Sequence, residues 1–238
     1  MSEQMNAPML PPPAGVSAWL STWREALTRP SDQTFARIAS SPQAKSTTAF
    51  LWIFLGSLLN FFLASLVQGA VIRQMLQNSD LGVDQFGAGP GGGLVTAICG
   101  APIAAIFSVI AFAIFVGVVQ LVAKMFGGRG TFDQLAYAIA AILTPFYLVS
   151  GFLALLGAIP YVGLCFGLVS LVAVLYVIAL EVMAVKGVNQ FGWGEAIGSY
   201  FLPGLVFACC IAVGIFGMAQ LLGPRISDVF DSINQSLP

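Results

Sequence analysis

The chain has 238 residues, of which 58% are apolar and only 8% are charged, with a formal net charge of −1. An average soluble domain is about 25% charged, and a water-soluble protein of this size could not cover its surface with so few charges. The composition therefore predicts an all-α integral membrane protein. Nine basic residues are too few to grip a nucleic acid, so we expect no nucleic-acid partner.

The chain begins with a polar, proline-containing stretch, "MSEQMNAPMLPPPAG", which predicts a flexible tail over residues 1–15. Residues 16–45 predict two cytoplasmic, interfacial amphipathic helices. The first places Trp19, Trp23 and Leu27 on one face and ends before Pro30. The second begins at Ser31, whose side chain can cap it. We expect both helices to lie in the membrane plane; a small soluble helical hairpin is the alternative.

Residues 46–222 predict a transmembrane domain of five helices. A bilayer core about 30 Å thick requires roughly 20 apolar residues in a helix. Helices are expected because an open sheet leaves backbone groups unsatisfied in lipid. Residues 223–238 predict an extracytoplasmic tail with a short amphipathic helix. The five predicted spans are residues 47–69, 96–123, 134–156, 160–184 and 196–222.

The basic residues predict the orientation of these spans. Seven of them fall on the side of the N-terminus and two on the opposite side, and cytoplasmic loops are the ones enriched in Lys and Arg. We therefore expect the N-terminus in the cytoplasm and the C-terminus outside. The seven are Arg24, Arg29, Arg37, Lys45, Lys124, Arg129 and Lys186, and the two are Arg73 and Arg225.

The stretch "FGGRGTFDQLAYAI", residues 126–139, contains three glycines between two apolar runs. A Walker phosphate loop would continue from the last glycine with Lys and then Ser or Thr, but Gly130 is followed by Thr131 and Phe132. Thr131 and Gln134 instead match a capping box that opens the third span. The residues expected to shape this turn or interface are Gly127, Gly128, Arg129, Gly130 and Phe132.

The predicted spans contain two polar residues and a pair of glycines that could make specific contacts. Asn60 lies near the middle of span one, where an interhelical hydrogen bond is favoured over substrate binding. Glu181 lies near the end of span four, where we expect it to reach the cytoplasmic interface, with Lys186 close enough to compete for it. Gly163 and Gly167 form a G-x-x-x-G face for close helix contact, in this bundle or with a partner.

Together these features resemble one known family. The Trp-containing segment followed by "TRPSDQTFARI", the five spans and "MFGGRGTFDQLAYAI" resemble the Yip-one (Ypt/Rab-interacting protein) domain family over about residues 19–222. The resemblance implies a five-helix membrane protein, linked in eukaryotes to vesicle traffic and small GTPases. The eukaryotic members carry an Asp-Leu-Tyr-Gly-Pro motif before the first span. It is absent here, so we expect no binding to a Rab-type GTPase. The short tail and loops indicate a bacterial-type member in the cytoplasmic membrane.

Histidine is absent from the chain, which removes the commonest general base and metal ligand. The four cysteines lie in apolar runs without a C-x-x-C pair. We therefore expect no enzyme, no cofactor and no metal site. The leading hypothesis is a membrane organiser or accessory subunit of a membrane complex, in contact with membrane lipid and membrane-protein partners through segment 17–39 and the turns at 126–133 and 186–195. A small permease or lipid transporter is the alternative, because prolines at 102, 145 and 203 can open a cavity.

Overall fold

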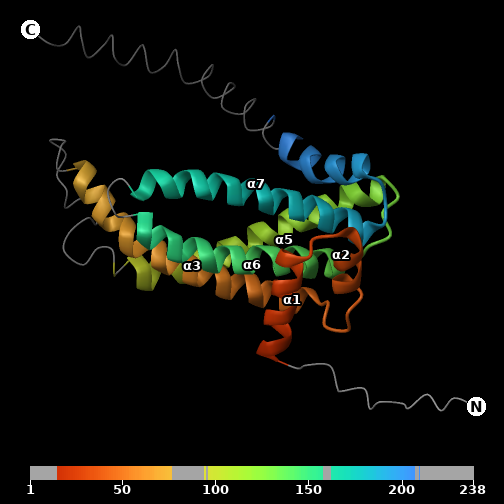
Figure 1. Ribbon diagram of the computed structural model, residues 1–238, viewed down its shortest axis with the longest axis horizontal. Coiled ribbons are helices and arrows are strands. Elements are labelled where there is room, and N and C mark those ends of the chain that lie inside the picture. Colours follow the sequence, from red (N-terminus) through yellow and green to blue (C-terminus); the bar gives the residue numbers. More distant parts are fainter. Residues whose placement is uncertain (1–14, 77–93, 95, 158–161, 207–208, 210–238) are drawn as a thin grey trace, which may run out of the picture.

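The computed structural model describes residues 15–76, 94, 96–157, 162–206 and 209. Over these residues the chain is built from helices and turns and contains no strand. The long helices run side by side along the longest axis of the molecule, and two short helices lie across one end of them (Figure 1). The predicted all-α fold class is therefore confirmed for the described part of the chain.

The bundle consists of α3 (Ser46–Leu76), α5 (Ala101–Met125), α6 (Phe132–Gly157) and α7 (Val162–Asn189). Each of these four helices contributes a segment long and apolar enough to cross a membrane. The segments are Ser46–Val67, Ala97–Met125, Phe132–Leu156 and Gly167–Asn189, and the second begins in the π-helical turn that precedes α5. The first three lie within a few residues of the predicted spans, and the fourth overlaps its prediction but extends to Asn189 rather than ending at 184. Of the fifth, predicted at 196–222, residues 196–206 belong to a described helical segment, 193–206. Apart from residue 209, the remainder lies outside the described residues, as does the predicted tail at 223–238.

Helix α6 forms the centre of the bundle and lies between α3 and α7 (Figure 1). Its first half is the best-buried segment of the chain, with every residue from Leu135 to Ile142 buried. Many of these residues are alanines, whose small side chains let the neighbouring helices approach closely. In a bilayer such close packing is what holds helices together, because lipid tails are as apolar as the side chains themselves.

Helices α3 and α6 meet through glycines and one polar side chain. A Cβ placed on Gly56 would lie 3.2 Å from Thr144 Cγ2, and one on Gly151 would lie 3.0 Å from Asn60 Cα. At this crossing Asn60 Nδ2 donates to the Tyr147 carbonyl at 3.0 Å and to Ser150 Oγ at 2.6 Å. The interhelical hydrogen bond predicted for Asn60 is therefore present.

Before α5 lies the π-helical turn η2 (Thr96–Gly100). Pro102 occupies the first turn of α5 directly after it. Proline is tolerated there, because the first-turn N–H groups of an α-helix have no intrahelical acceptor. Pro102 thus opens α5 rather than kinking it, whereas Pro145 lies inside α6.

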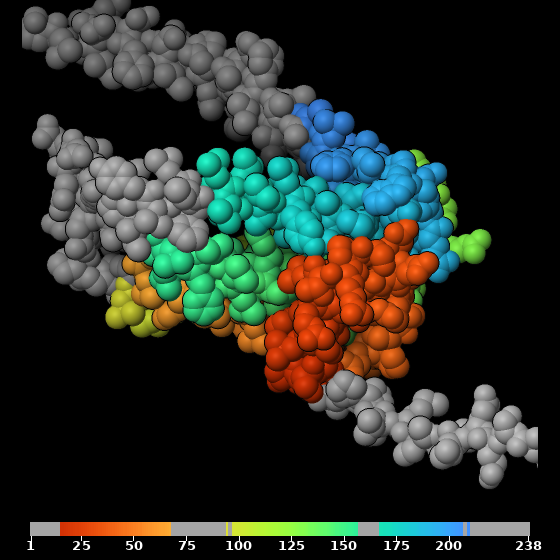
Figure 2. Space-filling view, in the orientation of Figure 1, coloured from red at the N-terminus to blue at the C-terminus, as the bar shows by residue number. Residues whose placement is uncertain are grey.

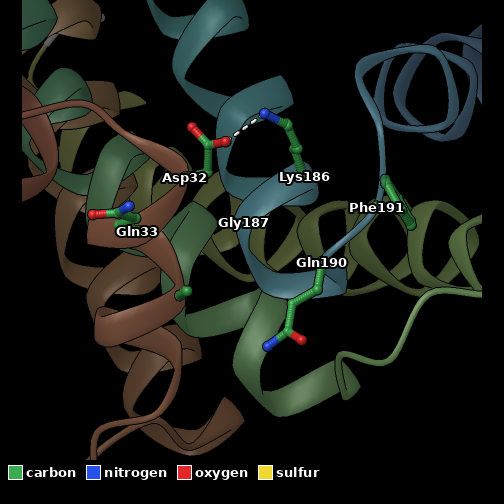
Figure 3. Close-up of a pocket in the computed structure, with 7 residues that line it drawn as sticks. Asp32, Gln33, Lys186, Gly187, Gln190 and Phe191 are labelled. Atoms are coloured by element: carbon green, nitrogen blue, oxygen red, sulfur yellow. Dashed lines mark hydrogen bonds and ion pairs between the residues drawn. The ribbon is translucent and has the colours of Figure 1, made fainter.

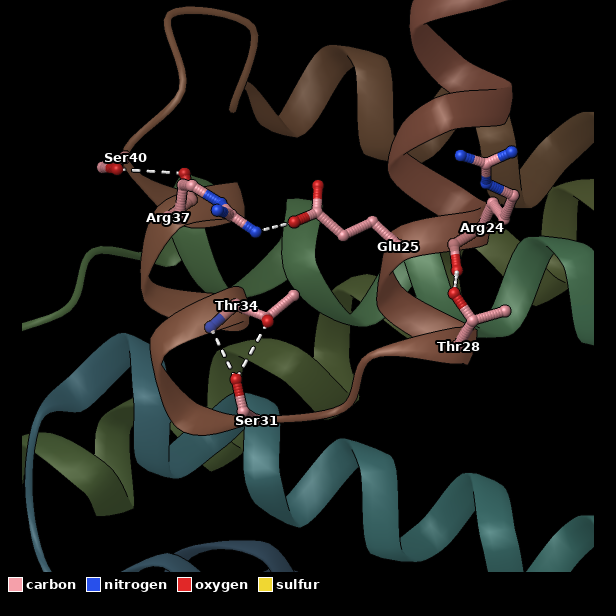
Figure 4. A network of polar contacts seen from close by, with 7 residues as sticks. All are labelled: Arg24, Glu25, Thr28, Ser31, Thr34, Arg37 and Ser40. Carbon is pink, nitrogen blue, oxygen red and sulfur yellow. Dashed lines mark hydrogen bonds and ion pairs between the residues drawn. The ribbon is translucent and has the colours of Figure 1, made fainter.

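The two short helices are α1 (Val16–Thr28) and α2 (Asp32–Ala39), joined at Pro30 as predicted. Ser31 caps α2, because its Oγ accepts the Thr34 N–H at 3.1 Å. An ion pair between Arg37 and Glu25 joins the two helices (Figure 4). The α1–α2 hairpin is therefore a small folded unit placed against the bundle, as the space-filling view shows (Figure 2).

Candidate functional site

Four segments far apart in the sequence meet at one end of the bundle, which we call the hairpin end. They are the α1–α2 hairpin, the turn between α5 and α6 (residues 126–131), the last turns of α7, and the turn that follows α7 (residues 190–192) (Figure 1). Most of the polar contacts between elements of the described chain lie here. The hairpin end is therefore the candidate functional site.

The α5–α6 turn docks onto the end of α7 through a buried polar network. The Arg129 N–H donates to the Asn189 carbonyl at 3.1 Å. Gln120 Nε2 donates to the Gly130 carbonyl at 2.7 Å and to Asn189 Oδ1 at 3.1 Å. Asn189 Nδ2 donates in turn to the Val185 carbonyl at 3.1 Å. Gln120 and Asn189 are both buried, so this network satisfies amides that would otherwise destabilise the fold.

The glycines of this turn are required by its close approach to Asn189. A Cβ on Gly128 would lie 2.6 Å from Asn189 Oδ1, and a Cβ on Gly130 would lie 2.6 Å from Val188 Cγ1. Gly127 has a φ of +85°, a left-handed conformation that favours glycine. The glycine-rich stretch is thus a packing turn, as the sequence analysis favoured.

The predicted capping box opens α6. Gln134 Oε1 accepts the Thr131 N–H at 2.9 Å, and Thr131 Oγ1 accepts the Gln134 N–H at 3.3 Å. Phe132 packs against the ring of Phe50 with centroids 6.3 Å apart, so it contributes to the core that joins α3 and α6. Arg129 is exposed beside it.

The tryptophans of α1 pack against protein. Trp19 and Trp23 meet Trp52 of α3 edge to face, with centroids 5.9 and 5.5 Å apart. Trp52 in turn lies 4.8 Å from the ring of Tyr137 on α6. We call these four side chains the tryptophan cluster. The ends of α3 and α6 thus offer an aromatic surface that partly buries the apolar stripe of α1. Docking of this helix in the membrane plane stays a prediction.

Helix α2 is held to the end of α7 by an ion pair and a close backbone crossing. The ammonium of Lys186 donates to the carboxylate of Asp32 (Figure 3). A Cβ on Gly187 would overlap the backbone carbonyl of Asp32, so only glycine permits this crossing. The Lys186 hydrogen bond holds the pKa of Asp32 below its usual value. Lys186 was expected to compete for Glu181, and that expectation was wrong because α2 brings Asp32 to it.

Glu181 differs from its expected position. It was expected to reach the interface near the end of span four, but α7 continues to Asn189, and the side chain is buried at 5% exposure. Its carboxylate accepts a hydrogen bond from the Tyr200 hydroxyl. Tyr200 belongs to the helical segment 193–206 and packs against Phe115 with centroids 5.6 Å apart. Glu181 is therefore enclosed by protein within the bundle.

The G-x-x-x-G face makes no close contact at its described glycine. Apart from the adjacent residues and backbone of α7 itself, no described atom lies within 4 Å of a Cβ placed on Gly167. The surroundings of Gly163 lie outside the described side chains. Residues 167–172 are all exposed, so contact of this face with a partner helix stays a prediction.

Among the described residues no group of three His, Cys, Asp or Glu side chains is placed to hold a metal ion. The hairpin end instead assembles exposed arginines around a rigid, hydrogen-bonded core. The family model of the Yip1 domain matches residues 24–216, which include α2, the α5–α6 turn and the described spans. The chain belongs to the Yip1 domain family. It matches no curated protein and no solved structure.

Sequence reasoning missed three residues of this Yip1 domain. Gln120 and Asn189 hold the glycine turn, and Tyr200 partners Glu181. A signal existed for Gln120, because an uncharged polar side chain in a long apolar run must find a partner. The contacts of Asn189 and Tyr200 depend on which helices pack against each other, and sequence periodicity does not specify the neighbours of a helix.

We predict that Gly128→Ala destabilises the Yip1 domain by about 1–3 kcal/mol, because the added methyl group overlaps Asn189. Thermal unfolding in a mild detergent measures the change. Gly167→Ala is the matched control; it meets open space and removes a flexible residue from a helix, so it should leave stability equal or higher. Equal melting temperatures for Gly128→Ala and the parent would contradict the docking role of this turn.

We also predict a pH dependence from Asp32. Because its folded-state pKa is lowered by Lys186, the ion pair contributes stability that is present above the unfolded pKa of about 4. This contribution is lost as the pH falls through the lower, folded-state pKa. The effect is small, because 45% of the Asp32 side chain is exposed. Melting temperatures between pH 6 and pH 2 should show it as a difference between the parent and Asp32→Asn that vanishes at the acid end. A difference that persists unchanged at low pH would exclude the ion pair as its origin.

Proposed function

We propose that this Yip1-domain protein is a non-catalytic organiser in the membrane, or an accessory subunit of a membrane complex, that engages its partner through the hairpin end. The observation that carries the proposal is the hairpin itself. It is fixed to the bundle by the tryptophan cluster and by the ion pair between Asp32 and Lys186. A fixed, charged surface at one end of an otherwise apolar bundle is the kind of surface that binds another molecule.

The charge of this surface supports an acidic partner. The arginines at positions 24, 29, 37 and 129 are all exposed. Within the described part of the chain, Arg37 is the one of the four that forms an ion pair, with Glu25. Exposed basic side chains near a bilayer attract anionic headgroups by about 1 kcal/mol each. They equally suit an acidic face of a membrane-protein partner lying beside the bundle. We therefore propose contact with both lipid headgroups and an acidic partner.

The placement in the cell follows from the same charges. Seven basic residues on the side of the hairpin end against two on the other support a cytoplasmic hairpin end and a bacterial cytoplasmic membrane. The proposal includes a fifth span at residues 196–222, beginning with the helical segment 193–206. With five spans the C-terminus lies outside. The missing eukaryotic motif supports a partner other than a Rab-type GTPase.

One observation favours the alternative of a small permease or lipid transporter. Glu181 is a carboxyl buried inside a candidate span and bonded to Tyr200, and intramembrane carboxyls often serve transport. A proton relay requires a second acid at a similar depth. In the described spans the other carboxyl is Asp133, in the first turn of α6, where its Oδ1 accepts the Ser46 N–H at 3.3 Å. We therefore interpret the Glu181–Tyr200 pair as a packing contact.

We predict that replacing both Trp19 and Trp23 with serine releases the hairpin and weakens partner retention, while the spans still insert. The change removes two of the four aromatic side chains that hold α1 in place. Affinity purification at native expression, followed by mass spectrometry of stoichiometric partners, measures retention.

The matched control replaces Val16 and Leu20 with serine. These residues lie on the same helix but are 64% and 56% exposed, so their loss leaves the tryptophan cluster intact. Partners should be retained in this control. A tryptophan double variant that keeps every partner of the parent would show that the hairpin end is not the working surface.

We predict that Glu181→Gln leaves stability and partner retention unchanged, because the glutamine carbonyl can still accept the Tyr200 hydroxyl hydrogen. The melting temperature and the same affinity purification measure this. The contrasting variant is Glu181→Leu, which removes the hydrogen-bond acceptor for Tyr200 and should lower the melting temperature. A Glu181→Gln protein that melts like the parent but loses proton-driven uptake in proteoliposomes would favour the permease instead.

A further inference from the structure

A pocket of about 340 Å³ lies between α2 and the end of α7 (Figure 3). Asp32, Gln33 and Ala36 line it from α2. The other side is formed by Lys186, Gly187, Gln190 and Phe191. The pocket is open to its surroundings, and the ion pair between Asp32 and Lys186 lies at one end of it (Figure 3). It therefore offers one cationic and one anionic group side by side to anything that enters.

Both charged groups have capacity for a ligand. A lysine ammonium has three N–H donors and a carboxylate can accept about four hydrogen bonds, whereas a single hydrogen bond joins Lys186 and Asp32. Lys186 Nζ also lies 4.4 Å from the centroid of the Trp193 ring, so its position is fixed by two partners. A ligand with a negative and a positive group can bind to both residues without breaking the pair.

The pocket lies at the end of a candidate membrane span, where we expect lipid headgroups. Lys186 belongs to the last turn of the candidate span Gly167–Asn189. Phe191 and Trp193 follow directly, and Trp193 is 49% exposed; aromatic side chains of this kind favour the membrane–water interface. A headgroup of the surrounding bilayer can therefore reach the pocket while its acyl chains stay in the hydrocarbon layer.

We propose that this pocket binds the headgroup of a zwitterionic phospholipid that carries a primary ammonium, phosphatidylethanolamine. The phosphate accepts hydrogen bonds from Lys186, and the ammonium donates to Asp32. An anionic lipid such as phosphatidylglycerol can offer Asp32 only neutral hydroxyl donors, and its uncompensated phosphate charge lies beside the carboxylate. Phosphatidylcholine has no N–H with which to donate to it. The ion pair thus selects for the ethanolamine headgroup.

Native mass spectrometry of the full chain in a neutral detergent tests the proposal. The parent is titrated with phosphatidylethanolamine, phosphatidylglycerol and phosphatidylcholine of identical acyl chains, and with soluble phosphoethanolamine. We expect phosphatidylethanolamine to bind most tightly. Asp32→Asn and Lys186→Met should each weaken it by about tenfold or more, since each loses a charge-assisted hydrogen bond. The soluble headgroup should bind much more weakly, because the acyl chains contribute to binding.

Two further variants keep the test decisive. Ala36→Phe fills the pocket and keeps both charged residues in the chain, so it should abolish binding even if the charge variants fold poorly. The double variant Val16→Ser and Leu20→Ser changes two exposed residues of α1 that do not line the pocket, and it should bind like the parent. Equal affinity for the three lipids, equal affinity for soluble phosphoethanolamine, or unchanged binding by Ala36→Phe would overturn the proposal.

Discussion

The hairpin end depends on the amide of Asn189, buried at the last residue of α7. Its side chain and backbone bind Gln120, Val185 and Arg129, and thereby tie α5, α7 and the α5–α6 turn together. An apolar helix end has no such specificity, because hydrophobic contact in a bilayer barely distinguishes one neighbour from another. The buried amide specifies which turn docks on α7 and in what position. Small residues must then surround it, which accounts for the glycines at 128 and 130.

The last residues of α7 also bind helix α2. Lys186 and Gly187 receive the start of α2, one helical turn before Asn189 receives the α5–α6 turn. The two faces of one short helical stretch therefore set the relative positions of the hairpin and of the glycine turn. This arrangement explains how a surface assembled from four distant segments can be well defined without a compact soluble domain beneath it.

Composition and hydrophobic run length were enough to predict an all-α membrane protein and the positions of four spans. Local chemistry was enough for the Ser31 cap and the Thr131–Gln134 capping box, because both join residues only three positions apart. It was also enough for the hydrogen bond of Asn60, because a polar group inside a span has few alternative partners in lipid. The sequence did not predict which side chains contact one another between different helices of the bundle. The sequence does not specify that α2 crosses α7 at Gly187, so it led Lys186 to be matched with Glu181 rather than with Asp32. Likewise, the buried position of Glu181 follows from α7 extending to Asn189 and from Tyr200 approaching it, and both are tertiary facts.

The placement of the indole rings has a spectroscopic consequence. The chain has four tryptophans: three lie in the tryptophan cluster and the fourth, Trp193, lies under the Lys186 ammonium. All four are at the hairpin end, and none lies along the remaining length of the spans. The intrinsic tryptophan fluorescence therefore reports on one end of the protein. Its quenching and emission wavelength follow the docking of the hairpin, whereas rearrangements at the opposite end of the bundle leave the emission unchanged.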